Sequence, residues 1–451
     1  MKCFAAVWLF SATALFAQNV QVLTLDEAIT IGRRNSRTLG ITAARASADQ
    51  ARAAEAGAQL YPGVALYGSY TRIKEGEFRL TPRNLPMTIS IGNVPPDQVI
   101  LRLGLRQPLF TGSRISGAAE AAGLQADASA LDVSMMSADV TLYITSAYWA
   151  LYQARQVEKY TEENVQRLES FHRDTERLVK AGVATRNDLL KVEVQLSNSR
   201  IGWIEARNEA ELGEMTLNNL IGQPTDTHID LASRPGDSAS RVSVLPPLAQ
   251  ASPDTLANLA TARRYDLQAA AARVQAAHAS VGAAKGGWWP QIELTANLNY
   301  NNPNARYQPV TPEFLGGWDV GVSLALDVWN WGATGNRVEQ AEAALRQAEL
   351  QKTQLKENIT LEVRRSALNV RRSQEKSSLA ELAVSQATEN LRVIADKYRS
   401  GLATSTDLLD AEVSLLQAQT QFSGAQVEYA LSQASLERAL GGLESSVRKA
   451  G

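Results

Sequence analysis

The sequence is built from two copies of one pattern. Residues 182–196 and 401–415 lie 219 positions apart and share nine identities over 15 positions without a gap. In the first copy these residues are Gly182, Ala184, Thr185, Asp188, Leu189, Leu190, Glu193, Val194 and Leu196. Pro62 matches Pro290 at an offset of 228, so a loop between Pro62 and Phe110 absorbs the difference of nine (228 − 219). Both halves are therefore expected to contain the same order of elements.

Each half contains a long stretch without proline that carries apolar residues at coiled-coil spacing. From Leu189 to Leu220 such residues step by three and four, and the positions from Leu408 to Ala439 do the same. This pattern predicts helices over 114–181, 186–221, 334–399 and 405–440. At 1.5 Å per residue the two longest helices reach roughly 100 Å. A compact sphere of this mass would be only about 60 Å across, so a globular fold is excluded.

A shorter helix opens each half and carries a capping signal. Thr24 and Glu27 form a capping box, and Ser252 precedes a proline at the first helical position. We predict helices over 25–60 and 253–288 that stop near Pro62 and Pro290. The first repeat then covers 18–222, an irregular segment 223–251 links it to the second repeat at 252–441, and 442–451 forms a tail.

Four short segments between the helices alternate apolar and polar residues. We predict strands over 64–71, 99–107, 291–300 and 318–328, each with one apolar face. Strands of about ten residues with one apolar face fit a membrane barrel. Aromatic residues cluster at the strand ends nearest the helices, as in an interfacial girdle: Phe110, Trp288, Trp289, Trp329 and Trp331.

Four strands do not close a barrel, and open sheet edges are not tolerated in lipid. Because the smallest membrane barrels need about eight strands, other copies of the chain must complete the sheet. Two, three or four subunits all satisfy this requirement. The polar inward faces require a water-filled lumen. A soluble sandwich has the same period, but four strands joined to such long helices leave no second sheet.

The first 17 residues have the features of a secretory leader, namely Lys2, an apolar run and small residues at the end. We place cleavage after Ala17, with Ala14 as the other candidate. After this leader no window of about 18 apolar residues occurs, so we expect no transmembrane helix.

Composition argues against several classes of function. The chain has 45 basic and 47 acidic residues, a balance that excludes a nucleic-acid binder acting through a basic field. Cys3 is the single cysteine and lies in the leader. His172, His228 and His278 are far apart in sequence. We therefore expect no catalytic residues, no cofactor and no metal site.

Several motifs, taken together with the duplication, resemble the TolC-like outer-membrane efflux proteins over essentially all of the mature chain. They are Leu25-Asp26-Glu27-Ala28, Gln107-Pro108-Leu109-Phe110, Ala147-Tyr148, the duplicated Gly-Val/Leu-Ala-Thr-x-x-Asp-Leu-Leu turn and Leu220-Ile221-Gly222-Gln223-Pro224. The resemblance implies a mostly α-helical homotrimer, in which a coiled-coil α-helical barrel crosses the periplasm. It is joined to a β-barrel in the outer membrane, with four strands per chain and hence twelve in the trimer.

The resemblance also implies partners and a function. A periplasmic adaptor would link the tunnel to an inner-membrane pump, and outer-membrane lipid would surround the strands. The chain would then be a passive exit duct of a tripartite efflux or type I secretion system, and not an enzyme. Whether small toxic compounds or polypeptides pass through it stays open. The alternative is a structural periplasmic coiled-coil protein without channel activity.

The two duplicated turns are the candidate tip that contacts the adaptor. They comprise Gly182, Val183, Ala184, Thr185, Gly401, Leu402, Ala403 and Thr404. Glycine permits a positive φ at a helix end, and Thr185 with Asp188 caps the next helix, as Thr404 does with Asp407. Capping alone, with no contact role, is the alternative interpretation.

The resemblance further implies a periplasmic gate formed by Asp407, Asp410, Asp188 and Tyr398. Asp407 and Asp410 match rings of carboxylates at the constriction and share one side of a helix. Two carboxylates per chain would give six in a trimer, favouring cations and raising some pKa values. Asp188 and Tyr398 match a pair that holds the family's entrance shut. The family's gate arginine is replaced by Ala403, so other contacts, such as Arg186 or Arg399, must serve.

Overall fold

The computed structural model describes residues 21–74, 76–80, 89–235, 252–307 and 311–442. The predicted leader and residues 236–251 of the predicted linker lie outside these ranges, as does nearly all of the predicted tail. The chain divides into two compact units. The first comprises Met1–Ile41, Ser134–Arg264 and Asn358–Gly451, and the second comprises Thr42–Val133 and Tyr265–Glu357. Each unit thus combines segments of both repeats.

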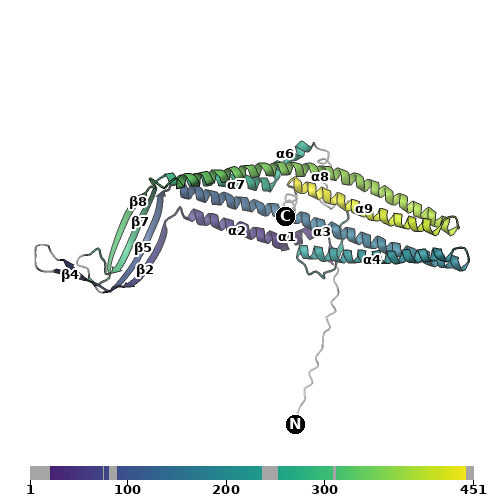
Figure 1. Ribbon diagram of the computed structural model, residues 1–451, viewed down its shortest axis with the longest axis horizontal. Helices are drawn as coiled ribbons and strands as arrows, with labels where there is room; N and C mark the ends of the chain where they lie inside the picture. The colour runs from purple at the N-terminus through teal and green to yellow at the C-terminus, as the bar shows by residue number, and fades with distance from the viewer. Residues whose placement is uncertain (1–20, 75, 81–88, 236–251, 308–310, 443–451) are drawn as a thin grey trace, which may run out of the picture. The chain divides into compact units, whose positions relative to one another are not determined.

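Four helices form two hairpins in the first unit. α3 (Arg114–Lys180) turns into α4 (Arg186–Ile221), and α8 (Ala333–Arg399) turns into α9 (Ser405–Ala439) (Figure 1). α3 and α8 begin in the second unit and continue into the first. These bounds differ from the predicted ranges by one residue at most. No helix of the described residues is both long enough and apolar enough to cross a membrane.

A second set of elements packs against the hairpins within the first unit. Strands β1 (Gln21–Leu23) and β6 (Ile229–Leu231) pair in parallel, and helices α1 (Leu25–Asn35) and α6 (Pro253–Arg263) belong to the same unit. The buried Tyr148 hydroxyl donates to the Leu23 carbonyl and accepts from the Ser233 amide, both at 3.0 Å. Tyr148 therefore ties α3 to both sides of this small sheet.

Two predicted helices are each broken in the structure. The helix expected over 25–60 is interrupted at Ser36, whose ψ is 114° and whose hydroxyl caps α2 (Arg37–Ala58) at the Leu39 amide. The helix expected over 253–288 is interrupted at Arg264, with ψ 126°, and α7 (Tyr265–Lys285) follows. Here the Arg264 guanidinium donates to Glu362 of α8 at 2.5 Å. A short 3-10 helix, η2 (Gly286–Trp288), ends this segment. The break at Arg264 lies where its side chain contacts α8, and no proline is present there.

The second unit contains a four-stranded antiparallel sheet in the order β2 (Gly63–Arg72), β5 (Asp97–Phe110), β7 (Gln291–Asn302) and β8 (Leu315–Ala325). β8 ends at Ala325, three residues before the predicted end, and Trp331 and Gly332 with positive φ turn the chain into α8. The loop flagged by the change of offset contains a hairpin that the sequence analysis missed. Its strands are β3 (Gly76–Leu80) and β4 (Ile89–Val94).

The register places apolar residues in rows across one face of this sheet. One row is Leu66, Leu103, Leu298 and Trp318, with exposed fractions of 76, 42, 59 and 73%. The opposite face is polar: Asn297 and Asn299 donate to Asp319 at 2.7 and 2.9 Å. Residues directly opposite in an antiparallel pair share a face, so the two faces are chemically distinct. In the described chain, β2 and β8 are edge strands.

Aromatic residues gather where the sheet meets the helices. Phe110 and Trp289 meet edge to face at 6.4 Å between ring centroids, and Trp329 meets Trp331 at 5.8 Å. Trp288 lies in η2, and all five rings are at least 43% exposed. Exposed rings of this kind are typical of a membrane–water interface.

Candidate functional site

The two hairpin ends have the same backbone. Gly182 and Gly401 adopt φ values of 75° and 70°, as the turn motif predicts. After each glycine the next amide reaches back into the finished helix: Val183 donates to Leu178 at 2.9 Å and Leu402 to Lys397 at 2.8 Å. These bonds satisfy carbonyls that the helix end leaves unpaired. Local sequence therefore fixes where each hairpin turns.

The predicted caps are confirmed at both ends. Thr185 Oγ1 donates to Asp188 Oδ2 at 2.6 Å, and Thr404 Oγ1 donates to Asp407 Oδ2 at 2.7 Å. In return the Asp188 and Asp407 amides donate to the threonine hydroxyls. The threonine hydroxyl bonds lower the pKa of both carboxyls most, and the backbone bonds add to this, with a further contribution from the Ser405 hydroxyl at Asp188. Both aspartates are therefore anionic at neutral pH.

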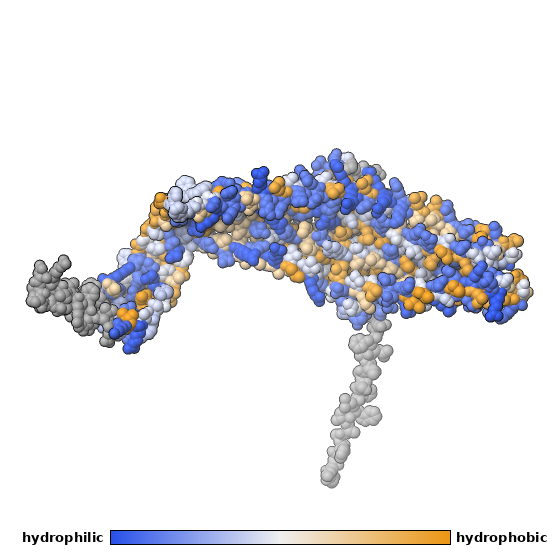
Figure 2. Space-filling view, viewed as in Figure 1, coloured by the Kyte–Doolittle hydropathy of each residue, from blue (hydrophilic) through white to orange (hydrophobic). Residues whose placement is uncertain are grey.

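Each end also presents one exposed aliphatic side chain. Val183 is 68% exposed and Leu402, its equivalent in the second repeat, is 79% exposed. The two glycines and both threonines of the turns are exposed as well, while Ala184 and Ala403 are half-buried. Figure 2 shows apolar side chains among the charged ones on the surface of the hairpins. Small, apolar and uncharged turn residues leave a surface onto which another protein could pack.

The predicted gate residues occupy different environments. Asp407 and Asp410 are exposed on α9. Tyr398 is buried on α8, where its hydroxyl lies 3.2 Å from Thr175 Oγ1 and its ring packs on Phe171. Asp188 Oδ1 instead accepts from Ser405 at 2.8 Å. Tyr398 and Asp188 thus have separate partners among the described residues, and their role as a gate pair stays a prediction.

A gate role for Arg186 or Arg399, in place of the missing arginine, stays a prediction. Arg399 bonds Asp396 at 3.0 Å, three residues away on its own helix. Arg186 is exposed at the start of α4. Neither observation assigns them to a contact between hairpins.

Sequence reasoning missed a group of polar contacts between the hairpins. Lys191 donates to Thr406 at 3.3 Å, and Arg167 of α3 pairs with Glu412 of α9 at 2.9 Å. Glu412 is 6% exposed, and burial raises its pKa, an effect that Arg167 only partly offsets. These contacts surround an apolar cluster to which all four helices contribute: Val165, Leu168, Phe171, Val192, Leu196, Tyr398 and Leu408. One feature of the sequence could have indicated the buried pair: Glu412 lies four residues after Leu408, on the apolar stripe of its helix.

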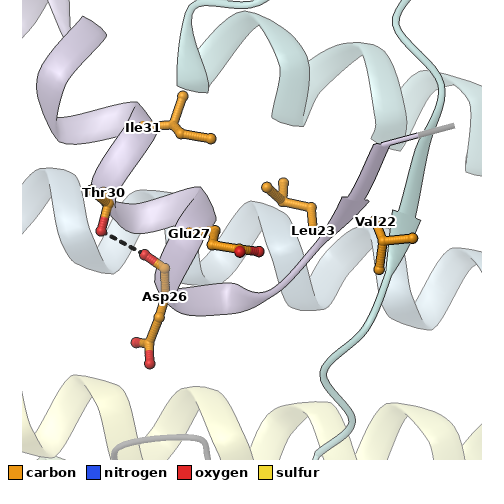
Figure 3. Close-up of a pocket in the computed structure, with 6 residues that line it drawn as sticks. All are labelled: Val22, Leu23, Asp26, Glu27, Thr30 and Ile31. Atoms are coloured by element: carbon orange, nitrogen blue, oxygen red, sulfur yellow. Dashed lines mark hydrogen bonds between the residues drawn. The ribbon is translucent and has the colours of Figure 1, made fainter. Parts of the chain in front are cut away.

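A pocket of 330 Å³ lies elsewhere in the first unit, beside the start of α1 (Figure 3). Its polar groups bond to neighbouring residues at the start of α1. Glu27 accepts from Thr24, and Thr30 donates to the Asp26 carbonyl at 2.8 Å. Within the described ranges, no three His, Cys, Asp or Glu side chains are grouped so that they could hold a metal ion.

Comparison with known proteins gives the relationships of the chain. It is 24% identical over 426 residues to the toluene efflux pump outer membrane protein TtgC of Pseudomonas putida, covering 93% of this chain and 83% of TtgC. It is 24% identical to the outer membrane protein TolC of Escherichia coli, covering 76% of this chain and 69% of TolC.

A solved structure has the same fold. The outer membrane protein VceC of Vibrio cholerae superposes with a TM-score of 0.75 at 22% identity, covering 93% of this chain and 96% of that protein. The model of the family described as "Outer membrane efflux protein" matches residues 30–223 and 256–442. These residues include both hairpins and all four strands of the main sheet. The chain belongs to the outer membrane efflux protein family.

Proposed function

We propose that three copies of this chain form a passive exit duct, connected through a periplasmic adaptor to an inner-membrane pump. The chain is an outer-membrane efflux protein whose helices extend into the periplasm. The names of its relatives, including a toluene efflux pump component, favour small compounds over polypeptides as the exported substrates. Energy for export would come from the pump.

The sheet of the second unit is the observation that carries this proposal. It has one apolar exposed face, one polar face and two edge strands, β2 and β8. In lipid, unpaired strand edges cost several kcal/mol per unsatisfied backbone group, so both edges need partners. In the proposed trimer each edge would pair with the edge of a neighbouring copy, and the four strands of each chain would give twelve. A structural coiled-coil protein would not need an exposed apolar stripe on its strands.

The hairpin ends supply the proposed adaptor contact. Val183 and Leu402 offer exposed apolar surface on turns that glycine and the threonine caps hold in one conformation. A rigid turn loses little conformational entropy when it binds. The adaptor would therefore meet residues 182–185 and 401–404.

The second hairpin end supplies the proposed selectivity of the entrance. Asp407 and Asp410 lie one turn apart on the exposed side of α9. In a trimer they would form rings of three carboxylates each. Cations would concentrate there, since like charges in a narrow bore attract counter-ions. Opening would shift the hairpins relative to one another when the adaptor binds.

The test is reconstitution of the purified protein from detergent into a planar lipid bilayer. We expect ion-conducting channels, and mass photometry in detergent should give the mass of three chains. Replacing Leu103 on the apolar face by Arg should abolish insertion, because a cation at the bilayer midplane costs about 2–4 kcal/mol. A water-soluble monomer that forms no channels would overturn the proposal.

A further inference from the structure

The duplication places a glutamate at equivalent positions of the two hairpins, Glu193 on α4 and Glu412 on α9 (193 + 219 = 412). Their environments differ. The side chain of Glu193 is 48% exposed and lies 3.4 Å from His172 in its own hairpin. The side chain of Glu412 is 8% exposed and reaches Arg167 in the other hairpin. One member of a duplicated pair has therefore become a buried link between hairpins.

Arg167 lies in the part of α3 that leads to the turn, and its guanidinium contacts Glu412. Nε donates to Glu412 Oε2 at 2.9 Å, and Nη1 lies 4.0 Å from Glu163 on the same helix. The Arg167 side chain is 30% exposed. Its Nη2 is buried and has no hydrogen-bond partner in the described part of the chain. The arginine is thus held mainly by the carboxylate of the opposite hairpin.

The surroundings make this pair sensitive to any displacement. The apolar cluster of the four helices lies around the level of the pair, with Leu168 next to Arg167 in α3 and Leu408 one turn before Glu412 in α9. Removing one partner of a buried pair leaves an uncompensated charge, whereas separating the helices lets water reach both groups. A buried pair of this kind selects one register between two helices more than it stabilises the fold.

We propose that Arg167 and Glu412 are positioning residues that hold the α8–α9 hairpin against α3 and so keep the entrance of the duct narrow. This inference rests on the proposed function. Ser405–Asp188 and Lys191–Thr406 join α9 to α4 and so connect the same two hairpins nearer to the turns. When the hairpins separate, the buried pair is the link that must break.

The experiment compares single-channel recordings of the full-length wild type with those of Glu412→Gln and Arg167→Met. We expect both variants to raise the open probability at least about tenfold, because losing one partner of a buried pair shifts a two-state equilibrium by more than one order of magnitude. Combining Arg167→Glu with Glu412→Arg should return the open probability toward that of the wild type. Equal open probabilities in wild type and single variants would overturn the inference.

Two controls come from the same chain. Glu193→Gln alters the equivalent exposed glutamate, and Arg200→Gln breaks the Arg200–Glu169 pair, which joins α3 to α4 inside one hairpin at 2.7 Å. Both should leave the open probability unchanged. If Glu412→Gln fails to assemble, Glu412→Asp, which keeps the charge and shortens the side chain, should still raise it. A wild type that forms no channels would refute the proposed function, whereas active channels with unaltered variants would refute this inference alone.

Discussion

The two hairpin ends share one backbone and differ in their side-chain partners. Both turn at a glycine with positive φ, and both begin the next helix with a threonine–aspartate capping box. Yet Asp188 also accepts from Ser405 of the other hairpin, while the Asp407 carboxylate accepts from its own Thr404. The comparison teaches that duplicated local sequence preserved the turn, and single substitutions then gave each end its own contacts.

The two hairpin ends also differ in charge. Lys191 of the first end corresponds to Asp410 of the second (191 + 219 = 410). Lys191 contributes to the contact between hairpins, whereas Asp410 is exposed. We therefore assign cohesion of the hairpins to the first end and the carboxylate rings to the second.

The largest expected difference concerns the duplicated glutamates. Glu412→Ala should destabilise the helices by about 3 kcal/mol, the low end for breaking a buried pair, because Arg167 is partly exposed. Glu193→Ala should change stability by less than about 0.5 kcal/mol, as an exposed substitution does. Urea denaturation in detergent, followed by circular dichroism at 222 nm, measures both. Similar losses would mean that the two sites are not distinct.

The turn glycines should behave alike. Gly182→Ala and Gly401→Ala place a Cβ in the left-handed region and should each cost about 1–2 kcal/mol. No atom lies within 4 Å of the added Cβ at either position, so backbone strain alone sets the cost. The same denaturation assay applies. A difference of more than about 1 kcal/mol between the two variants would break the backbone equivalence.

The carboxylates of the second end should control block by multivalent cations. Asp407→Ala combined with Asp410→Ala should weaken the block by roughly tenfold, because nearby negative charge raises the local cation concentration. Lys191→Ala is the matched change at the first end and should leave the block unweakened. The block is measured by titrating single channels with a trivalent cation. An unaltered block in the aspartate double variant would refute the selectivity assignment.

The smallest effect is a dependence on acid pH. The cap bonds lower the folded-state pKa of Asp188 and Asp407, so these groups stabilise the helix starts above their unfolded pKa. The stability is lost as pH falls through the lowered folded-state values, below about 4. Asp188→Asn should remove part of this acid dependence and also loosen the Ser405 contact, whereas Asp407→Asn should weaken its cap without changing a contact between the hairpins.

Thermal midpoints measured by circular dichroism between about pH 3 and pH 6 would test this. An identical pH profile in wild type and both variants would contradict the capping account.

The hairpins could be predicted from local patterns in the sequence, whereas contacts between distant residues could not. The helix bounds, the turns and the caps follow from heptad spacing, glycine and threonine, all within a few residues. Arg167 and Glu412 are separated by 245 positions, so no local pattern connects them. β1 and β6 are three residues each and too short to show a period. Arg264, at which a helix is interrupted, bonds a partner 98 residues away. Such features depend on tertiary contacts that override local propensity.

The interleaving of the repeats sets the order in which the chain can complete its folding. The first unit needs α9, whose buried Leu436 lies near the end of the described chain and whose Arg438 donates to Asp139 of α3 at 2.8 Å. A nascent chain therefore displays unfinished apolar surface until almost its last helix is made. Such a chain depends on protection from aggregation during export, and a truncation before α9 should yield an insoluble product instead of a half-sized protein.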